Sequence, residues 1–213
     1  MKTKIFQTMN LKNKIFLIVL LLIVISCGQA KYARFYVLQY KPLPITELKI
    51  EKPFPYNIVV DEFQTDRTYD NSRIVIRHSA HEIFYDQFSL WALRPQNAIT
   101  NLLVNHINTL GIVENCKLRY LELTPDYKIK GTIKKIEKYE NNLIIRADLQ
   151  IEIQFIDLKT NDVVFTKTLT SYTKLYTNSM SYFTKVLSDN LNIEFNSFIE
   201  DMITYFKLQN KSE

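Results

Sequence analysis

The chain has 213 residues, of which 46% are hydrophobic and 23% are charged. This composition is typical of a globular protein, and the length suits one domain with a substantial core. Four lysines in residues 1–26 contribute most of the formal net charge of +5, and the other 187 residues carry 23 basic against 22 acidic side chains. The chain therefore lacks the basic footprint that nucleic-acid binding requires.

Glycine is scarce, with Gly28, Gly111 and Gly131 the only three. A phosphate-binding loop needs glycines close together so that the backbone can approach the anion. No two of these glycines are closer than 20 residues, which excludes P-loop and dinucleotide fingerprints and the G-x-S-x-G turn of hydrolases. No serine, cysteine or threonine stands in a recognised catalytic motif either. The sequence predicts no enzyme and no dissociable cofactor.

The first predicted element is a secretory signal over residues 1–26. Lys12 and Lys14 precede an unbroken apolar run of eleven residues, Ile15–Ile25. A charged start, a short apolar core and small residues after it are typical of a signal peptide. A membrane-spanning helix needs about 20 apolar residues, so this run is too short to be one.

The end of this signal, Val24-Ile25-Ser26-Cys27, resembles the lipobox of bacterial lipoproteins. The resemblance implies a diacylglyceryl group on the Cys27 thiol, cleavage before Cys27 and acylation of its new amine. Residues 27–33 would then be a lipidated tether, held firmly by two or more acyl chains. The alternative is an ordinary signal peptide, cut after Ala30 to release a soluble protein. In that case Cys27 could pair with Cys116; with Cys27 lipidated, Cys116 is expected to be buried in the core.

Several strands are predicted before the first helix. Residues 34–40 are rich in aromatic and β-branched side chains and are apolar on both faces, which fits a buried central strand. Residues 41–55 contain four prolines and are expected to form a loop. Further strands are predicted at residues 57–63, 73–77 and 81–87, with a polar turn at 66–71.

The first helix is predicted to begin at Arg94-Pro95, because proline fits the first helical turn. Gly111 follows the helix where a left-handed C-cap belongs. The apolar positions recur at spacings of three and four on one face: Ala98, Ile99, Leu102, Leu103, Ile107 and Leu110.

A three-stranded meander is predicted next. Residues 127–133 alternate between apolar and polar side chains, and the phase slips at Lys135-Ile136, which predicts a bulge. Residues 143–155 keep a strict two-residue period, with one face toward the core and the other toward water. Residues 163–172 return as the third strand. Turns are expected at 141–142 and 159–162.

The last predicted element is a long helix from about Ser179 to Phe206, with Asn178 or Ser179 as its N-cap. The tail at 209–213 is polar and expected to fray. The predicted apolar stripe comprises Phe183, Leu187, Leu191, Phe195, Phe198, Met202 and Phe206. Two amphipathic helices on a mixed, mostly antiparallel sheet predict a two-layer α+β fold, with one domain over residues 34–208.

Between Cys27 and about Phe165 the chain resembles the ABC-type transport auxiliary lipoprotein family. The resemblance lies in the order and spacing of short motifs behind a lipobox. Two positions depart from the family pattern: Leu90 stands where a basic residue is expected and Leu93 where an acidic one is common. The motifs are Phe35-Tyr36-Val37-Leu38, Ile58-Val59-Val60, the run from Tyr69 to Arg77, Trp91-Ala92-Leu93-Arg94-Pro95 and Tyr127-Lys128-Ile129-Lys130-Gly131.

The resemblance implies a non-catalytic, lipid-anchored accessory component of a transport system. Its partners would be a mammalian-cell-entry (MCE) domain protein and the associated ABC permease and ATPase, which move phospholipid or other hydrophobic molecules across the cell envelope. A homo-oligomer is possible. Gly28, not aspartate, follows Cys27, which in many Gram-negative bacteria directs a lipoprotein to the periplasmic face of the outer membrane.

Four residues are candidates for partner binding, each with a simpler alternative. Arg73 and Arg77 could hold carboxylates or phosphates, since guanidinium groups suit both, or they could be the wet edge of a half-buried strand. Tyr69 and Trp91 could be interface anchors, although Trp91 could equally fill the core.

Other polar residues favour structural explanations. His78 and His81 are three apart on a predicted strand and face opposite sides, so no metal site is predicted. His106 is expected to be a satisfied or half-exposed histidine of the first helix. Glu137 and Glu140 are expected to be solvated, as are the strand lysines Lys128, Lys130 and Lys134.

Two alternative functions remain open from the sequence. The abundance of phenylalanine and tyrosine, 13 of each, would suit a lipoprotein that holds one hydrophobic ligand between sheet and helices. An outer-membrane assembly lipoprotein is a further alternative, and it depends on fold analogy alone.

Overall fold

The computed structural model describes residues 12, 32–42, 44 and 52–212. The chain divides into two compact units, Met1–Tyr32 and Ala33–Glu213. The predicted signal, the lipidation site Cys27 and most of the tether lie outside the described residues, as does much of the predicted loop at 41–55. None of the described helices is both long and apolar enough to cross a bilayer.

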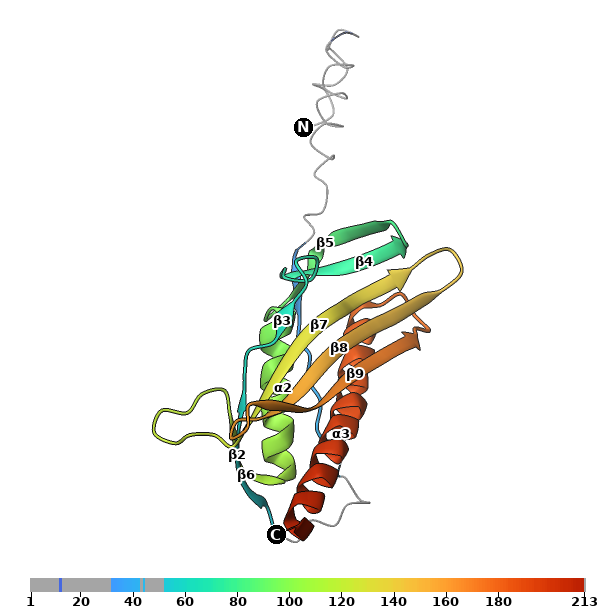
Figure 1. Cartoon of the computed structure of the whole chain (residues 1–213). Coiled ribbons are helices and arrows are strands. Elements are labelled where there is room, and N and C mark those ends of the chain that lie inside the picture. The colour runs from blue at the N-terminus through green and yellow to red at the C-terminus, as the bar shows by residue number, and fades with distance from the viewer. Residues whose placement is uncertain (1–11, 13–31, 43, 45–51, 213) are drawn as a thin grey trace, which may run out of the picture. The chain divides into compact units, whose positions relative to one another are not determined.

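The second unit contains a nine-stranded mixed sheet and two helices (Figure 1), and this confirms the predicted α+β fold. The elements are β1 (Arg34–Tyr36), β2 (Phe54–Val60), β3 (Gln64–Thr65), β4 (Arg73–Ser79), β5 (Glu82–Trp91), α2 (Pro95–Leu110), β6 (Val113–Lys117), β7 (Tyr127–Glu140), β8 (Ile145–Asp157), β9 (Asp162–Lys174) and α3 (Met180–Ser212).

Strand β7 is the centre of the sheet. One of its edges pairs along its whole length with β8, which pairs in turn with β9. Its other edge pairs in succession with the shorter strands β2, β3 and β4. The long ladders β7–β8 and β8–β9 and the β4–β5 hairpin are antiparallel, and the remaining short ladders are parallel.

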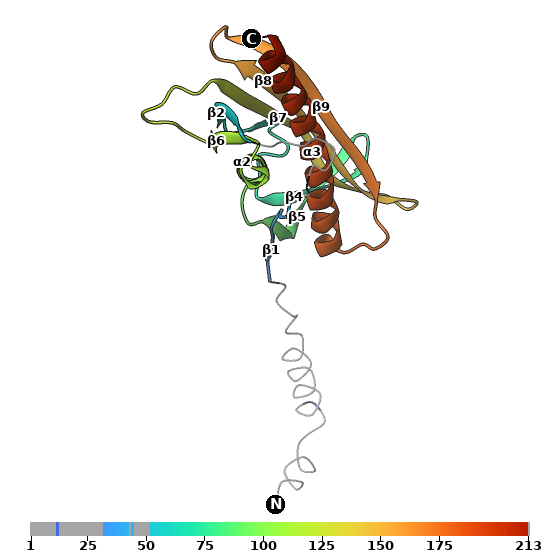
Figure 2. The same cartoon turned by 90° about the horizontal axis from the view of Figure 1, so that it is seen from below.

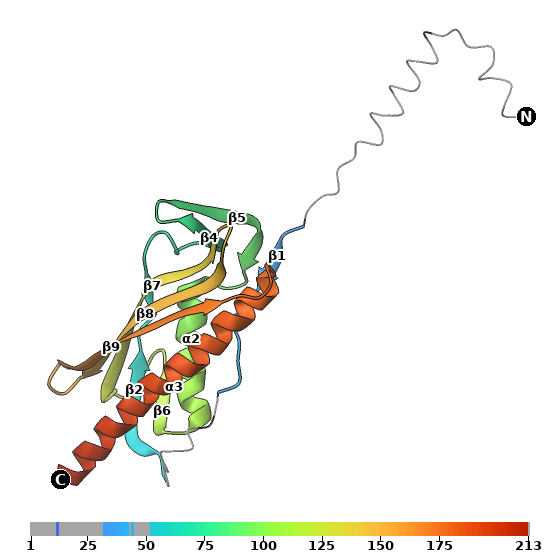
Figure 3. The same cartoon turned by 90° about the vertical axis from the view of Figure 1, so that its right-hand side faces the viewer.

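Both helices lie on the same face of the sheet (Figures 1 and 2). Helix α3 packs against β8 and β9, and α2 packs against β6 and β7. Figure 3 shows α3 running from the end of β9 to the start of β2, where Phe206 lies 5.1 Å from the Phe54 ring. All seven residues of the predicted α3 stripe are fully buried, as a 3.6-residue period on a covered face requires.

The predicted meander and first helix are confirmed, except that Asp148, on the face of β8 that was expected to be toward water, is fully buried. The inward positions of β8, from Ala147 to Phe155, are fully buried. The ladder shifts between Ile133 and Lys135, so Lys134 is the extra residue of the predicted bulge. Helix α2 begins at Pro95, and Gly111 caps it with a φ of 62°, a left-handed conformation that glycine adopts without steric cost.

The prediction for residues 34–40 was wrong. They form a three-residue strand, β1, at an edge of the sheet and not at its centre, and Phe35 is 67% exposed. An unbroken apolar run fits a central strand, but β1 is the end of the strand order and pairs only with β5 among the described strands.

Other element boundaries also differ from the predictions. Strand β2 covers 54–60 instead of 57–63, and β3 and β6 had no predicted counterpart. Strand β5 extends to Trp91 past an irregularity in which Asp86 Oδ1 accepts hydrogen bonds from the N–H groups of Phe88 and Ser89. Helix α3 continues to Ser212, into the tail that was expected to fray.

Candidate functional site

A pair of buried carboxylates lies on the face of the sheet away from the helices. Glu137 on β7 and Asp148 on β8 are cross-strand neighbours, and each residue is fully buried. The adjacent pair Ile136 and Leu149 faces the helices, so the alternation of the strands turns both carboxylates to the opposite side. Two like charges directly opposite each other would destabilise the ladder unless counter-ions offset them.

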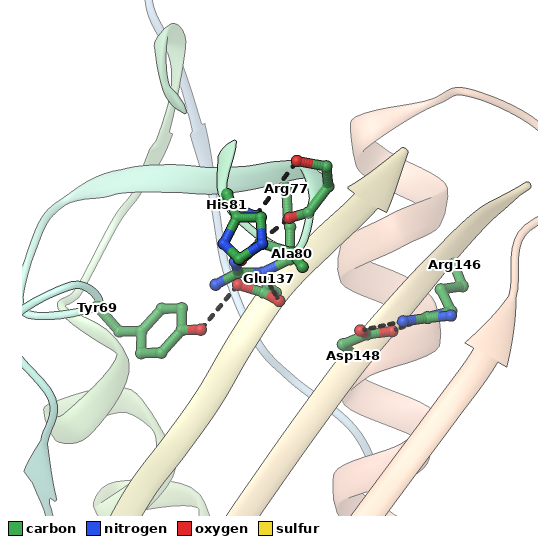
Figure 4. Close-up of polar contacts among 8 residues, drawn as sticks. Tyr69, Arg77, Ala80, His81, Glu137, Arg146 and Asp148 are labelled. Atoms are coloured by element: carbon green, nitrogen blue, oxygen red, sulfur yellow. Dashed lines mark hydrogen bonds and ion pairs between the residues drawn. The ribbon is translucent and has the colours of Figure 1, made fainter. Parts of the chain in front are cut away.

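Glu137 is held by two donors from elsewhere in the chain (Figure 4). Tyr69 Oη donates to Oε2 at 2.7 Å, and Arg77 Nε donates to Oε1 at 2.6 Å. Tyr69 comes from the turn after β3 and Arg77 from β4. Burial and the neighbouring carboxylate raise the pKa of Tyr69, and the hydrogen bond to Glu137 raises the pKa of Arg77.

Asp148 has its own counter-ion on the same strand. Arg146 donates to both carboxylate oxygens, with Nε at 2.6 Å and Nη2 at 3.1 Å. Its guanidinium lies 4.2 Å from the centre of the Tyr139 ring and 5.5 Å from that of Tyr172, the geometry of cation–π contacts. Burial raises the pKa of Asp148, and Arg146 opposes that rise.

The residues Tyr69, Arg77, Glu137, Arg146 and Asp148 are called the carboxylate cluster below. Its ion pair between Arg77 on β4 and Glu137 on β7 fastens the β4–β5 hairpin to the meander. Arg77 Nη1 also lies 3.4 Å from the Ala80 carbonyl oxygen in the hairpin turn. Each carboxylate is engaged by a guanidinium, and in the described part of the chain no group of histidine, cysteine, aspartate and glutamate is placed to hold a metal ion. The arrangement is suited to positioning the hairpin.

The four candidate partner-binding residues have different environments. Tyr69 and Arg77 both donate hydrogen bonds to Glu137. The sequence therefore indicated two members of this cluster but not Glu137, the acceptor that they share. Arg73 is exposed at the start of β4. Trp91 is 4% exposed, and its ring centre lies 6.3 Å from that of Phe183. This environment agrees with the alternative that Trp91 fills the core. The described surface offers neither aromatic ring to a partner.

The prediction that Glu137 is solvated was wrong. The residue is fully buried because the Tyr69 turn and β4 cover that end of β7, which the alternation alone could not reveal. Glu140 is partly exposed but engaged, since it accepts hydrogen bonds from Lys138 and Asn178. Lys130 and Lys134 are exposed as expected, and the half-buried Lys128 lies 3.6 Å from Asp61.

The three histidines lie in different environments: two accept or donate hydrogen bonds within the domain, and one is exposed. His106 is fully buried and satisfied: Tyr40 Oη lies 3.0 Å from Nδ1, and Nε2 lies 2.8 Å from Asn196 Oδ1. Burial lowers the pKa of His106. His78 Nδ1 lies 2.7 Å from the Glu140 carbonyl oxygen, and His81 is exposed in the hairpin turn. Cys116 is buried as predicted, and burial raises its thiol pKa to about 12.

An apolar groove of about 630 Å³ lies between the segment after β1 and helix α2. Its lining includes Val37, Tyr40, Leu93, Ala98, Leu102 and Asn105. Its size and its apolar lining with a few polar groups fall in the range of small-molecule sites. The space between the sheet and the helices, where the sequence suggested a ligand, is filled by buried side chains.

No known family model matches the sequence, and no curated protein matches it. Solved structures do match the fold. Protein XCC0632 from Xanthomonas campestris, of family DUF330, is 14% identical with a TM-score of 0.71, over 84% of this chain and all of that one. An uncharacterised protein is 12% identical with a TM-score of 0.64, over 80% of this chain and 99% of that one.

Lipoprotein GNA1162 from Neisseria meningitidis is a weaker match, 8% identical with a TM-score of 0.30 over 67% of this chain and 99% of that one, and carries no argument. None of these descriptions names an enzymatic activity. The chain is thus an α+β domain with the fold of the DUF330 protein.

Proposed function

We propose that the protein is a non-catalytic, lipid-anchored accessory component of an ABC/MCE-type transporter that moves phospholipid or other hydrophobic molecules across the cell envelope. The observation that carries the proposal is the fold match to XCC0632, which extends over that whole protein. DUF330 proteins form the ABC transport auxiliary lipoprotein family, and this is the family that the sequence motifs resemble.

The N-terminal sequence supports the anchor. The lipobox-like Val24–Cys27 precedes the domain unit, which begins at Ala33, by only a few residues. We place the protein at the periplasmic face of the outer membrane, on account of Gly28 after Cys27. The anchor would consist of a diacylglyceryl group and an N-acyl chain on Cys27.

The carboxylate cluster supports a non-catalytic role. Glu137 and Asp148 are each engaged by an arginine, whereas a general base must be able to reach a substrate proton. Its effect is to fix the β4–β5 hairpin, which exposes Arg73 and part of Arg77. We infer that this hairpin surface contacts the transporter, with arginine available to partner carboxylates.

Affinity purification from detergent-solubilised membranes tests the proposal. The tagged protein should recover an MCE-domain protein together with the permease and ATPase, and Arg73→Glu should reduce that recovery several-fold. Lys130→Glu is the matched control, because it makes the same charge change at another exposed position. Recovery of unrelated proteins alone would contradict the proposed function.

The groove beside α2 favours a second candidate function, that of a carrier for one hydrophobic ligand. Native mass spectrometry after gentle extraction would show a bound lipid, and Ala98→Trp should abolish it by filling the groove. Ala80→Trp, in the exposed hairpin turn, should leave the bound mass unchanged. An empty wild-type protein under lipid-preserving conditions would exclude the carrier.

A further inference from the structure

Large apolar side chains are exposed where the domain begins. Phe35 is 67% exposed, Val37 57% and Leu93 54%. Isolated exposed apolar residues are common on proteins, but a contiguous group of them marks an interaction site. The group comprising Phe35, Val37 and Leu93 is called the entry patch below.

Strand pairing brings the entry patch together. Strand β1 pairs in parallel with the end of β5, with Phe35 beside Leu90 and Tyr36 beside Trp91. The N–H of Ala92 donates to the Tyr36 carbonyl oxygen at 2.9 Å. This hydrogen bond keeps the two segments together as far as the residue before Leu93. Val37 and Leu93 line the mouth of the same groove.

Chain length limits what can cover this patch. Only residues 28–32 separate Cys27 from the start of the domain unit at Ala33. An extended chain spans at most about 3.6 Å per residue, so Ala33 lies within roughly 20 Å of Cys27. A lipid on Cys27 therefore holds the entry patch next to the bilayer surface.

The chemistry of the patch matches that surface. Burial of the exposed side chains of Phe35, Val37 and Leu93 at the boundary between headgroups and acyl chains would remove apolar surface from water. Arg34, the residue before Phe35, is exposed, and a basic side chain at this position favours anionic headgroups. We propose that the entry patch inserts into the headgroup region of the membrane that holds the Cys27 lipid. This inference depends on the anchor in the proposed function.

Depth-dependent quenching on the full lipidated protein tests the inference. Phe35→Cys and Leu93→Cys, made separately, would be labelled with an environment-sensitive fluorophore in nanodiscs of phosphatidylethanolamine and phosphatidylglycerol containing nitroxide-labelled lipid. The native thiols do not interfere, because Cys116 is 2% exposed with its pKa raised to about 12, and Cys27 is a thioether.

Leu121→Cys is the matched control. Leu121 is a leucine, 91% exposed, in the connection between β6 and β7. Figure 2, in which β1 is labelled, shows this connection projecting from the side of the domain beyond β6, away from β1. The nitroxide lipid should quench the labels at 35 and 93 at least threefold more than the label at 121, and thermal unfolding should show that each variant is folded.

Failure of this inference can be distinguished from failure of the proposed anchor, because the intact mass of the protein shows independently whether Cys27 is lipidated. Equal quenching at all three positions in lipidated protein would overturn the inference and leave the anchor in place. A blue-shifted label at 35 that nitroxide lipid does not quench would assign the patch to a protein neighbour, and would overturn it too. A mass without the diacylglyceryl group would overturn both the inference and the anchor.

Discussion

At the scale of single residues, the main feature is a pair of buried carboxylates, each of which is paired with an arginine. Glu137 and Asp148 are fully buried neighbours, and two guanidinium groups lie within hydrogen-bonding distance of them. An ion pair at such a site contributes little net stability over an apolar alternative, but loss of one partner is costly because the other is left unpaired.

Glu137→Ala should therefore lower the free energy of unfolding by about 3 kcal/mol, because Tyr69 and Arg77 lose a charged acceptor. Chemical denaturation would measure the change. Asp189→Ala is the control, since Asp189 pairs with Lys185 on the exposed side of α3 and exposed pairs contribute little. Two similarly small changes would show that the cluster does not hold the hairpin.

His106 should make stability depend on pH. Its folded pKa lies below the ordinary value because it is buried, so the unfolded state binds more protons as the pH falls through about 6.5. We expect the wild-type free energy of unfolding to fall between pH 7 and pH 5. His106→Gln should flatten this pH dependence and His81→Gln should not; identical slopes for wild type and His106→Gln would contradict the assignment.

At the scale of elements, Phe63 packs closely against β7 because Gly131 has no side chain. A Cβ atom at Gly131 would lie 2.3 Å from the Phe63 ring, so the phenylalanine after β2 sits directly on the backbone of β7. The bulge at Lys134 then resets the phase, which brings Ile136 to the helix side and Glu137 to the outer side.

Gly131→Ala should destabilise the domain by about 2 kcal/mol, because an added methyl group forces a packed ring to move. Combining it with Phe63→Leu should cost less than the sum of the two single changes, since the smaller side chain makes room. Thermal or denaturant unfolding of the three variants measures this coupling, and strict additivity would show that the two sites do not share the space.

At the scale of the whole molecule, the exposed entry patch and the proposed lipid anchor on Cys27 would together suit a component held at a membrane surface. The proposed location can be changed by one residue. We expect Gly28→Asp to move the protein from the outer-membrane to the inner-membrane fraction on a density gradient, with Gly28→Ser as the control. An unchanged distribution would contradict the proposed outer-membrane location.

The sequence by itself determined the features that repeat along one element: the α3 stripe, the alternation of β8, the bulge after Ile133 and the cap at Gly111. These depend on periods of a few residues, so the local sequence contains the whole signal. Only the tertiary structure decided that β1 is an edge strand and that Glu137 and Asp148 are buried. Glu137 meets Tyr69 and Arg77 across 68 and 60 residues of chain, and no local period reports which segments fold over a strand's outer face.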